Sequence, residues 1–137
     1  MKPTLQTGLT AEASFEVDRG RTIDFMGEAA RVYATPMLVR DIEMTCRNLL
    51  LAHLDAGEDS VGTRVEIDHI GATLLGMQVT LTVRIAELNG RAVVFEVEGR
   101  DAVEPIVRGK HSRFVVDVTK TAQRLAAKAE KARAAKA

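Results

Sequence analysis

The composition of this 137-residue chain is that of one globular domain of moderate size. It is 46% hydrophobic and 28% charged, which supplies material for one core, and its length is too short for two ordinary domains. It has no run of about 18 apolar residues for a transmembrane helix, and its N-terminus lacks the apolar core of a signal peptide. The single cysteine, Cys46, excludes an intramolecular disulfide and fits a reducing cytoplasm.

Charge is divided unevenly, although the formal net charge is zero. From Thr119 onward there are six basic residues and one acid, which leaves 13 basic and 18 acidic residues in positions 1–118. An acidic body argues against nucleic acid as a partner, since neutralising phosphates needs a basic face. We interpret residues 1–118 as a single domain and residues 119–137 as a basic, Ala-rich helix or frayed tail that binds no membrane.

The chain opens with a short strand and an irregular connector. Residues 13–18 alternate enough for a strand, with Phe15 and Val17 on one face. Residues 19–34 have no sustained period and predict irregular structure with at most one helical turn. A helix of about five turns then begins at Thr35, a good N-cap, and runs to Ala56.

One apolar stripe of this predicted helix contains a carboxylate. Val39, Cys46, Leu50 and Leu54 share a face at helical spacing, and Glu43 lies among them. A buried, unpaired carboxylate is costly, so such residues are uncommon unless they are paired or functional. Two structural alternatives stay open: the edge of the stripe leaves Glu43 partly wet, or a core arginine pairs with it.

After the helix the period changes from 3.6 to 2. Alternating segments cover residues 61–69, 79–85, 91–102 and 108–118, and Asn89-Gly90 is a strong hairpin signal. One strand, one helix and four antiparallel strands predict an α+β fold, in which a curved antiparallel sheet of about five strands encloses the helix. Exposed sheet edges favour pairing between two copies, so we expect a homodimer.

Two polar residues near these elements are candidates for chemistry, each with a structural alternative. His69 shares a strand face with Val65 and Ile67, and it is either a satisfied core histidine or a functional group. Helix capping alone explains Thr35, but helix N-termini also bind polarised oxygens. The three histidines match no zinc spacing, so we expect no metal.

A cluster of basic residues occurs in "RGKHSRF". Strand alternation places Arg108 and Lys110 on one face, and His111 and Arg113 on the other. The cluster is either a solvated edge strand or a phosphate-binding patch.

Together these pieces resemble the hot-dog-fold thioesterases, most closely the fluoroacetyl-CoA thioesterase-like branch. The resemblance covers roughly residues 10–117 and is carried, in order, by "ATPMLVRDIE", "VGTRVEIDHIGATLLG", "GRAVVFEVEGRD" and "GKHSRFVV". It implies a hot-dog fold and a catalytic group of Thr35, Glu43 and His69. It also implies that the backbone of Gly62 approaches the thioester carbonyl and that Arg113 lies near the acyl-CoA.

The resemblance does not extend to the acyl group. In the family, fluoroacetyl selectivity is associated with aromatic side chains in the connector. Here the connector offers Phe25 and Tyr33 without a phenylalanine pair spaced by three residues. We therefore assign Phe25 a substrate contact but do not expect fluoroacetyl-CoA to be the substrate.

The function implied is hydrolysis of a small acyl-CoA thioester by a cytoplasmic enzyme, with Glu43 as nucleophile or general base. CoA is part of the substrate, and no separate cofactor is expected. The site would lie at the interface of a homodimer, and a dimer of dimers stays open. The alternative is a non-catalytic acyl-CoA-binding or regulatory hot-dog module. A hydratase is weaker, because those enzymes usually pair Asp and His in a differently spaced motif.

Overall fold

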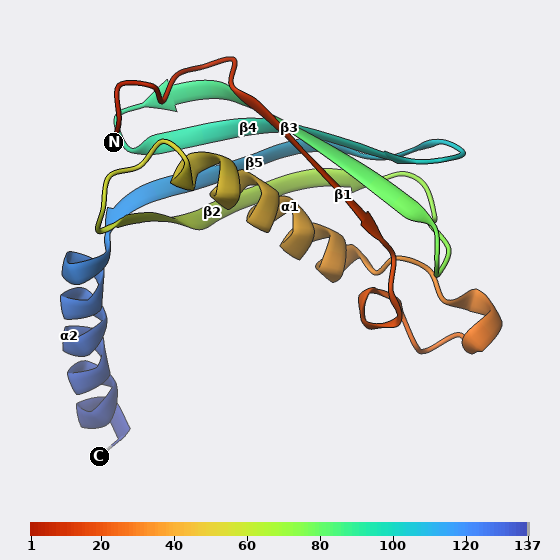
Figure 1. Ribbon diagram of the computed structural model, residues 1–137. Coiled ribbons are helices and arrows are strands. Elements are labelled where there is room, and N and C mark those ends of the chain that lie inside the picture. Colours follow the sequence, from red (N-terminus) through yellow and green to blue (C-terminus); the bar gives the residue numbers. More distant parts are fainter. Residues whose placement is uncertain (137) are drawn as a thin grey trace.

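The computed structural model describes residues 1–136, which form one curved antiparallel sheet and two helices (Figure 1). The sheet has the strand order β1-β3-β4-β5-β2, so β1 and β2 are its edges. This arrangement confirms the predicted α+β fold. In chain order the elements are β1 (Thr10–Glu16), the 3₁₀ turns η1 (Arg19–Arg21) and η2 (Glu28–Ala30), α1 (Thr35–Leu51), β2 (Glu58–His69), β3 (Gln78–Asn89), β4 (Ala92–Asp101), β5 (Pro105–Asp117) and α2 (Val118–Lys136).

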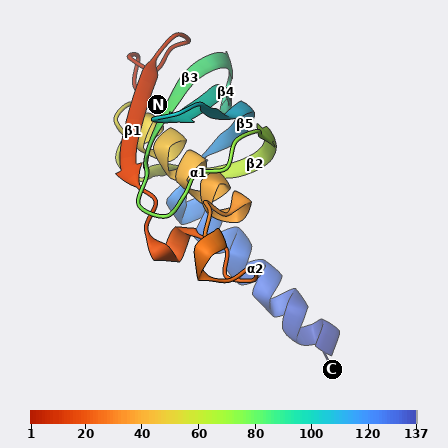
Figure 2. The ribbon, with the colours of Figure 1, turned by 90° about the vertical axis from the view of Figure 1, so that its right-hand side faces the viewer.

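The sheet curves around α1, and the view turned by 90° shows the helix in the hollow of the sheet (Figure 2). Inward side chains of the strands and one face of α1 form a single core, because a lone amphipathic helix can bury its apolar face only against an enclosing sheet. The largest fully buried side chains include Tyr33, Leu38, Ile42, Leu50, Leu81, Ile85, Phe95 and Ile106.

The start of α1 differs from the prediction. Ala34, in an extended conformation, is the N-cap and provides no side-chain hydrogen bond, so the assignment of Thr35 as N-cap is wrong. Thr35 is instead the first helical residue, and its hydroxyl is hydrogen-bonded to His69. Proline in the first turn is still tolerated, because the N–H that Pro36 lacks would have no helical partner there.

The helix also ends earlier than predicted, at Leu51 rather than Ala56. The last turn tightens, since the N–H of His53 donates to the carbonyl of Leu50, three residues back. Gly57 then adopts a φ of +85°, a left-handed value that suits glycine, and the chain reverses into β2.

The buried face of α1 is displaced from the predicted stripe. Leu38, Ile42, Cys46 and Leu50 are fully buried, and burial raises the pKa of the Cys46 thiol to about 12. Glu43 lies at the edge of this face with 39% of its side chain exposed. The alternative in which the edge of the stripe leaves Glu43 partly exposed is therefore confirmed for the single chain. A fully buried Glu43 is not found, because Glu43 faces the edge strand β2 and the sheet does not extend beyond it.

Most predicted strands are found with shifted ends. Gly90 and Arg91 form the two-residue turn between β3 and β4, with Gly90 at a φ of +61°, so the turn lies one residue later than the Asn89-Gly90 signal. The first strand covers residues 10–16 rather than 13–18, and Val17 follows it as a buried residue. The register of β2 against β5 shifts between Gly62 and Arg64, which is a β-bulge.

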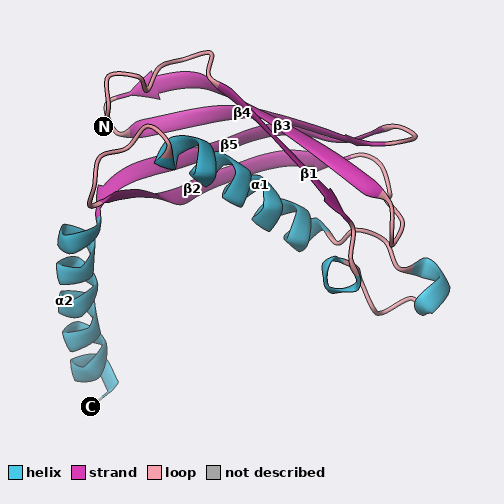
Figure 3. Cartoon of the chain, in the orientation of Figure 1, coloured by secondary structure: helices cyan, strands magenta, loops and turns pink. Residues whose placement is uncertain are grey.

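The second helix extends away from the body, as Figure 3 shows. It begins at Val118, whose N–H donates to the carbonyl of Gly57, and its side chains are not buried within the described chain. The predicted Ala/Lys-rich C-terminal segment is thus helical through Lys136, and Ala137 lies outside the described residues. Within residues 1–136, neither α1 nor α2 combines the length and hydropathy of a membrane-spanning helix.

Two phenylalanines on neighbouring strands provide a test of this core. Phe95 on β4 is fully buried, whereas Phe114 on β5 points to the outer face and is exposed. Phe95→Ala should lower the free energy of unfolding by about 3–5 kcal/mol, because it removes contacts and leaves a cavity. Phe114→Ala should cost no more than about 1 kcal/mol. Urea unfolding of the two variants measures the difference, and equal losses would contradict the assigned core.

Candidate active site

The first pair of candidate residues meets where α1 begins and β2 ends. Thr35 Oγ1 lies 2.7 Å from His69 Nδ1, and the imidazole tautomer decides which atom donates. Nε2 of His69 is buried and makes no hydrogen bond of ordinary geometry within residues 1–136, although the backbone of Gly71 lies near the ring and opposes the lowering of its pKa. Buried ring nitrogens are normally paired, so Nε2 remains available to a group that enters beside it. Burial lowers the pKa of His69 below its ordinary 6.5, which keeps the ring neutral at pH 7.

A pocket of about 300 Å³ opens beside this pair. Its walls include the apolar side chains of Ile23, Val32 and Ile70, and it contains no carboxylate, lysine or arginine. Phe25, the predicted substrate contact, is not among the lining residues, and 76% of it is exposed. Within the single chain the pocket therefore suits a small apolar group.

Glu43 lies in a second group of polar residues, on the β2 side of α1. The nearest part of the sheet is Gly62, where an added Cβ would come within 2.6 Å of Glu43 Oε2 and 3.2 Å of His111 Cε1. Any larger residue at position 62 would displace the carboxylate or the imidazole. The absence of a side chain thus brings the β2 backbone directly against Glu43. The approach of the Gly62 backbone to a thioester carbonyl stays a prediction.

A buried arginine holds the Glu43 carboxylate. Arg113 is only 4% exposed, and its Nη1 donates to Glu43 Oε2 at 3.3 Å. Its Nε and Nη2 donate to the hydroxyl and carbonyl oxygens of Ser60 at 2.7 and 2.8 Å. Burial lowers the pKa of Arg113 and the Glu43 carboxylate opposes this shift. The sequence left open that a core arginine pairs with Glu43, and Arg113 is that arginine. The predicted contact between Arg113 and the substrate stays a prediction.

His111 completes this second group. Its Nδ1 lies 2.8 Å from the carbonyl of Arg64, an acceptor, so Nδ1 carries the proton. Its Nε2 then accepts from Arg113 Nη1 at 3.2 Å, and its ring stacks on Phe95. Burial is the main cause that lowers the pKa of His111, in keeping with a neutral ring. The sequence showed that His111 and Arg113 share a strand face. It did not show that His111 accepts a hydrogen bond from Arg113 beside Glu43.

The "RGKHSRF" segment does not form one phosphate-binding surface. His111 and Arg113 point inward, as alternation predicts, whereas Arg108 and Lys110 lie on the outer face of β5. Only the outward pair is accessible to a phosphate in the single chain.

The two groups are separate in the single chain. Thr35 and Glu43 lie eight residues apart on α1, which corresponds to about 12 Å along the helix axis. The structure thus unites Thr35 with His69, and Glu43 with Gly62 and Arg113, but it does not bring the groups together.

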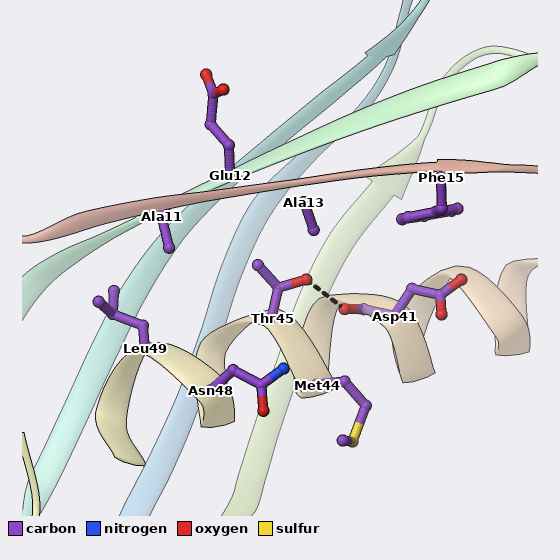
Figure 4. A pocket seen from close by; sticks show the side chains of 9 residues that line it. All are labelled: Ala11, Glu12, Ala13, Phe15, Asp41, Met44, Thr45, Asn48 and Leu49. Atoms are coloured by element: carbon purple, nitrogen blue, oxygen red, sulfur yellow. Dashed lines mark hydrogen bonds between the residues drawn. The ribbon is translucent and has the colours of Figure 1, made fainter. Parts of the chain in front are cut away.

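A second hollow, a groove of about 360 Å³, lies between β1 and α1 (Figure 4). Phe15 of β1 and Asp41 of α1 line it, and the Thr45 hydroxyl donates to the Asp41 carbonyl at 2.7 Å. None of the residues predicted for the site lines this groove.

Comparison with known proteins identifies one enzyme family. Residues 17–119 match the family model described as fluoroacetyl-CoA-specific thioesterase. The chain is 29% identical over 127 residues to the fluoroacetyl-CoA thioesterase of Streptantibioticus cattleyicolor, and the alignment covers 88% of this chain and 91% of that relative.

Solved structures agree with this match. The fluoroacetyl-CoA thioesterase FlK superposes with a TM-score of 0.84 at 27% identity, over 90% of this chain and 97% of that one. A variant of FlK in complex with fluoroacetate and CoA gives 0.80 at 29% identity, over 85% and 99% of the two chains. A thioesterase superfamily member from Thermus thermophilus gives 0.87 at 25% identity, over 96% and 98%. The chain therefore belongs to the fluoroacetyl-CoA-specific thioesterase family and is a thioester hydrolase with the hot-dog fold.

Proposed function

We propose that the protein hydrolyses a small acyl-CoA thioester to the free acid and CoA, with Glu43 as general base or nucleophile. The observation that carries the proposal is the position of the Glu43 carboxylate, which Arg113 holds against the backbone of Gly62. The substrate class is supported by the relatives, one of which was solved with fluoroacetate and CoA. A single buried thiol, Cys46, favours the cytoplasm as the place of action.

As a general base, Glu43 would take a proton from water while the water oxygen attacks the thioester carbonyl carbon. Collapse of the tetrahedral intermediate breaks the C–S bond, and the proton passes to the departing sulfur. As a nucleophile, a Glu43 oxygen would attack directly and release CoA, and water would then hydrolyse the resulting anhydride. A positioned base contributes about 10²–10⁴ in rate. Nε2 of His69 would bond the carbonyl oxygen or transfer the proton, and Thr35 would orient the ring.

A second copy of the chain would complete this site. The strand β2 is an edge of the sheet and exposes Val61 and Val65. When two edge strands pair antiparallel, the first half of one lies opposite the second half of the other. Glu43 and Gly62 of one copy would then face the partner's His69. We therefore propose a homodimer in which each active site combines the two groups from different subunits.

Thiol release from short, branched and aromatic acyl-CoAs tests the assignment of Glu43 and His69. Glu43→Gln keeps an acceptor for Arg113 but removes the base, so kcat should fall by about 10²–10⁴. His69→Gln should also lose most activity. Glu87→Gln removes an exposed carboxylate from β3, away from the β2 edge, and serves as the matched control, with turnover unchanged. Saturable binding of the CoA esters without thiol release would instead identify a binding module.

Mixing two inactive variants tests the shared site. In a heterodimer of Glu43→Gln and His69→Gln, one site receives both intact residues and the other receives neither. Random exchange should restore about a quarter of the wild-type activity, because half of the dimers are mixed and each has one good site. If both residues of a site come from the same chain, no activity returns on mixing. The exchanged fraction is measured by mass spectrometry with one variant isotopically labelled.

The pH profile reports on His69. Because burial lowers its pKa below 6.5, the ring stays neutral until the pH falls through that lowered value. If the neutral ring is the active form, kcat/KM should stay level from about pH 8 to 6.5 and decline only below that range. The residual activity of His69→Gln should lack this decline. A decline centred above pH 7 would show that the folded protein raises this pKa instead.

A further inference from the structure

An ion pair between the buried Asp41 and the partly exposed Arg21 lies on the opposite flank of α1 from Glu43. Asp41 accepts hydrogen bonds from Arg21 Nε at 2.9 Å and from Arg21 Nη2 at 3.3 Å. The hydroxyl of Tyr33 donates to the same carboxylate. The guanidinium of Arg21 lies 4.6 Å from the ring centroid of Phe15, which Figure 4 shows above Asp41. Asp41 therefore has its charge matched and both carboxylate oxygens hydrogen-bonded.

Two routes connect this ion pair with Thr35 and His69. The first is the backbone: the N–H of Ala34, which precedes Thr35, donates to the Arg21 carbonyl at 2.8 Å. The second is the ring of Tyr33, which stands edge-on to the His69 imidazole with centroids 6.3 Å apart. These contacts fix the end of the connector (residues 19–34) immediately before α1. The residues fixed there adjoin Tyr33 and Thr35, which contact His69.

We propose that Arg21, Tyr33 and Asp41 form a latch that positions Thr35 and His69 for turnover; this rests on the proposed function of that pair. Arg21 and Asp41 are positioning residues, because they act through Ala34 and Tyr33.

The chemistry of the latch suits orientation better than stability. The ion pair is partly removed from water, so the cost of desolvating its charges offsets part of their attraction and its net contribution to stability is small. The planar guanidinium nevertheless fixes the direction of both hydrogen bonds that it gives to the carboxylate. Burial raises the pKa of Tyr33, so its hydroxyl remains a donor at every pH used for an assay.

Breaking the latch should lower kcat without an equal change in KM. Arg21→Met and Asp41→Asn should each reduce kcat about tenfold, since small displacements of reacting groups have effects of this size or larger. KM should stay within about threefold, and Arg21→Lys should recover part of kcat. The double variant should lose no more than the worse single variant, because the pair acts as a unit.

The connector contains a matched control. Arg19 and Glu28 form an exposed ion pair at 2.7 Å, so Arg19→Met should leave kcat unchanged. All rates are compared per folded protein, with the folded fraction taken from thermal unfolding curves. If both single latch variants keep kcat within twofold of wild type, or if the double variant loses the product of the single effects, the latch is overturned.

A second measurement separates this inference from the proposed function. The imidazole NMR resonances of His69, assigned with His69→Gln, should shift in Arg21→Met and in the conservative Tyr33→Phe, but not in Arg19→Met. Unchanged resonances in both latch variants would overturn the latch even in an active enzyme. A wild-type protein that releases no thiol would contradict the proposed function alone, and the NMR series would then decide whether the latch exists.

Discussion

The enclosure of one helix by one curved sheet is the constraint on which the rest of this structure depends. The face of α1 that bears Leu38, Ile42 and Leu50 is covered by the sheet, so polar groups of the helix that contact the rest of the chain lie on its two flanks. Asp41 occupies one flank and Glu43 the other, as their 200° separation on a helix requires. The fold thus places its two functionally interesting carboxylates at the margin of the core.

Each of these carboxylates is met by an arginine from elsewhere in the chain. Arg113 reaches Glu43 from β5, and Arg21 reaches Asp41 from the connector. The environments differ: Asp41 is buried and has three donors, whereas Glu43 has one donor and a wet face. A carboxylate with both oxygens hydrogen-bonded and shielded from water is suited to holding structure, and one with an exposed oxygen is suited to reacting with water or substrate. The geometry itself distinguishes the two roles.

Hydrophobic periodicity made the order of helices and strands predictable. The exact ends of α1 were not predictable, because local hydrogen bonds there compete with contacts to distant residues. The change from period 3.6 to period 2 and the Asn89-Gly90 turn signal gave the order of elements, because those signals are local. Thr35 was misassigned as the cap because it is already part of the helix, and its hydroxyl bonds to His69, a residue distant in sequence, rather than to the helix backbone. The end of α1 was also misplaced. A tight turn after Leu51 provides hydrogen-bond donors to the last carbonyls of the helix, as a longer helix would.

For the candidate site the sequence yields candidate residues, whose roles stay predictions, but it does not yield their arrangement in space. The family resemblance placed Thr35, Glu43 and His69 in one catalytic group. Within a single chain Thr35 and Glu43 belong to two separate groups, because one helix cannot bring its own ends together. The role of His111 depends on Phe95 and on a carbonyl of β2, neither of which is near it in sequence. Asp41 escaped notice because a charged residue beside an apolar stripe is typical of a solvated flank, and its partner lies twenty residues away.

The solitary cysteine has a practical consequence for enzymology. With a pKa of about 12, Cys46 is ionised in only about one molecule in ten thousand at pH 8, and its sulfur lies inside the core. Aromatic disulfide reagents that detect CoA react with thiolates at an accessible surface. The folded enzyme therefore adds no signal of its own in such an assay, and the colour measures only the thiol of the released CoA.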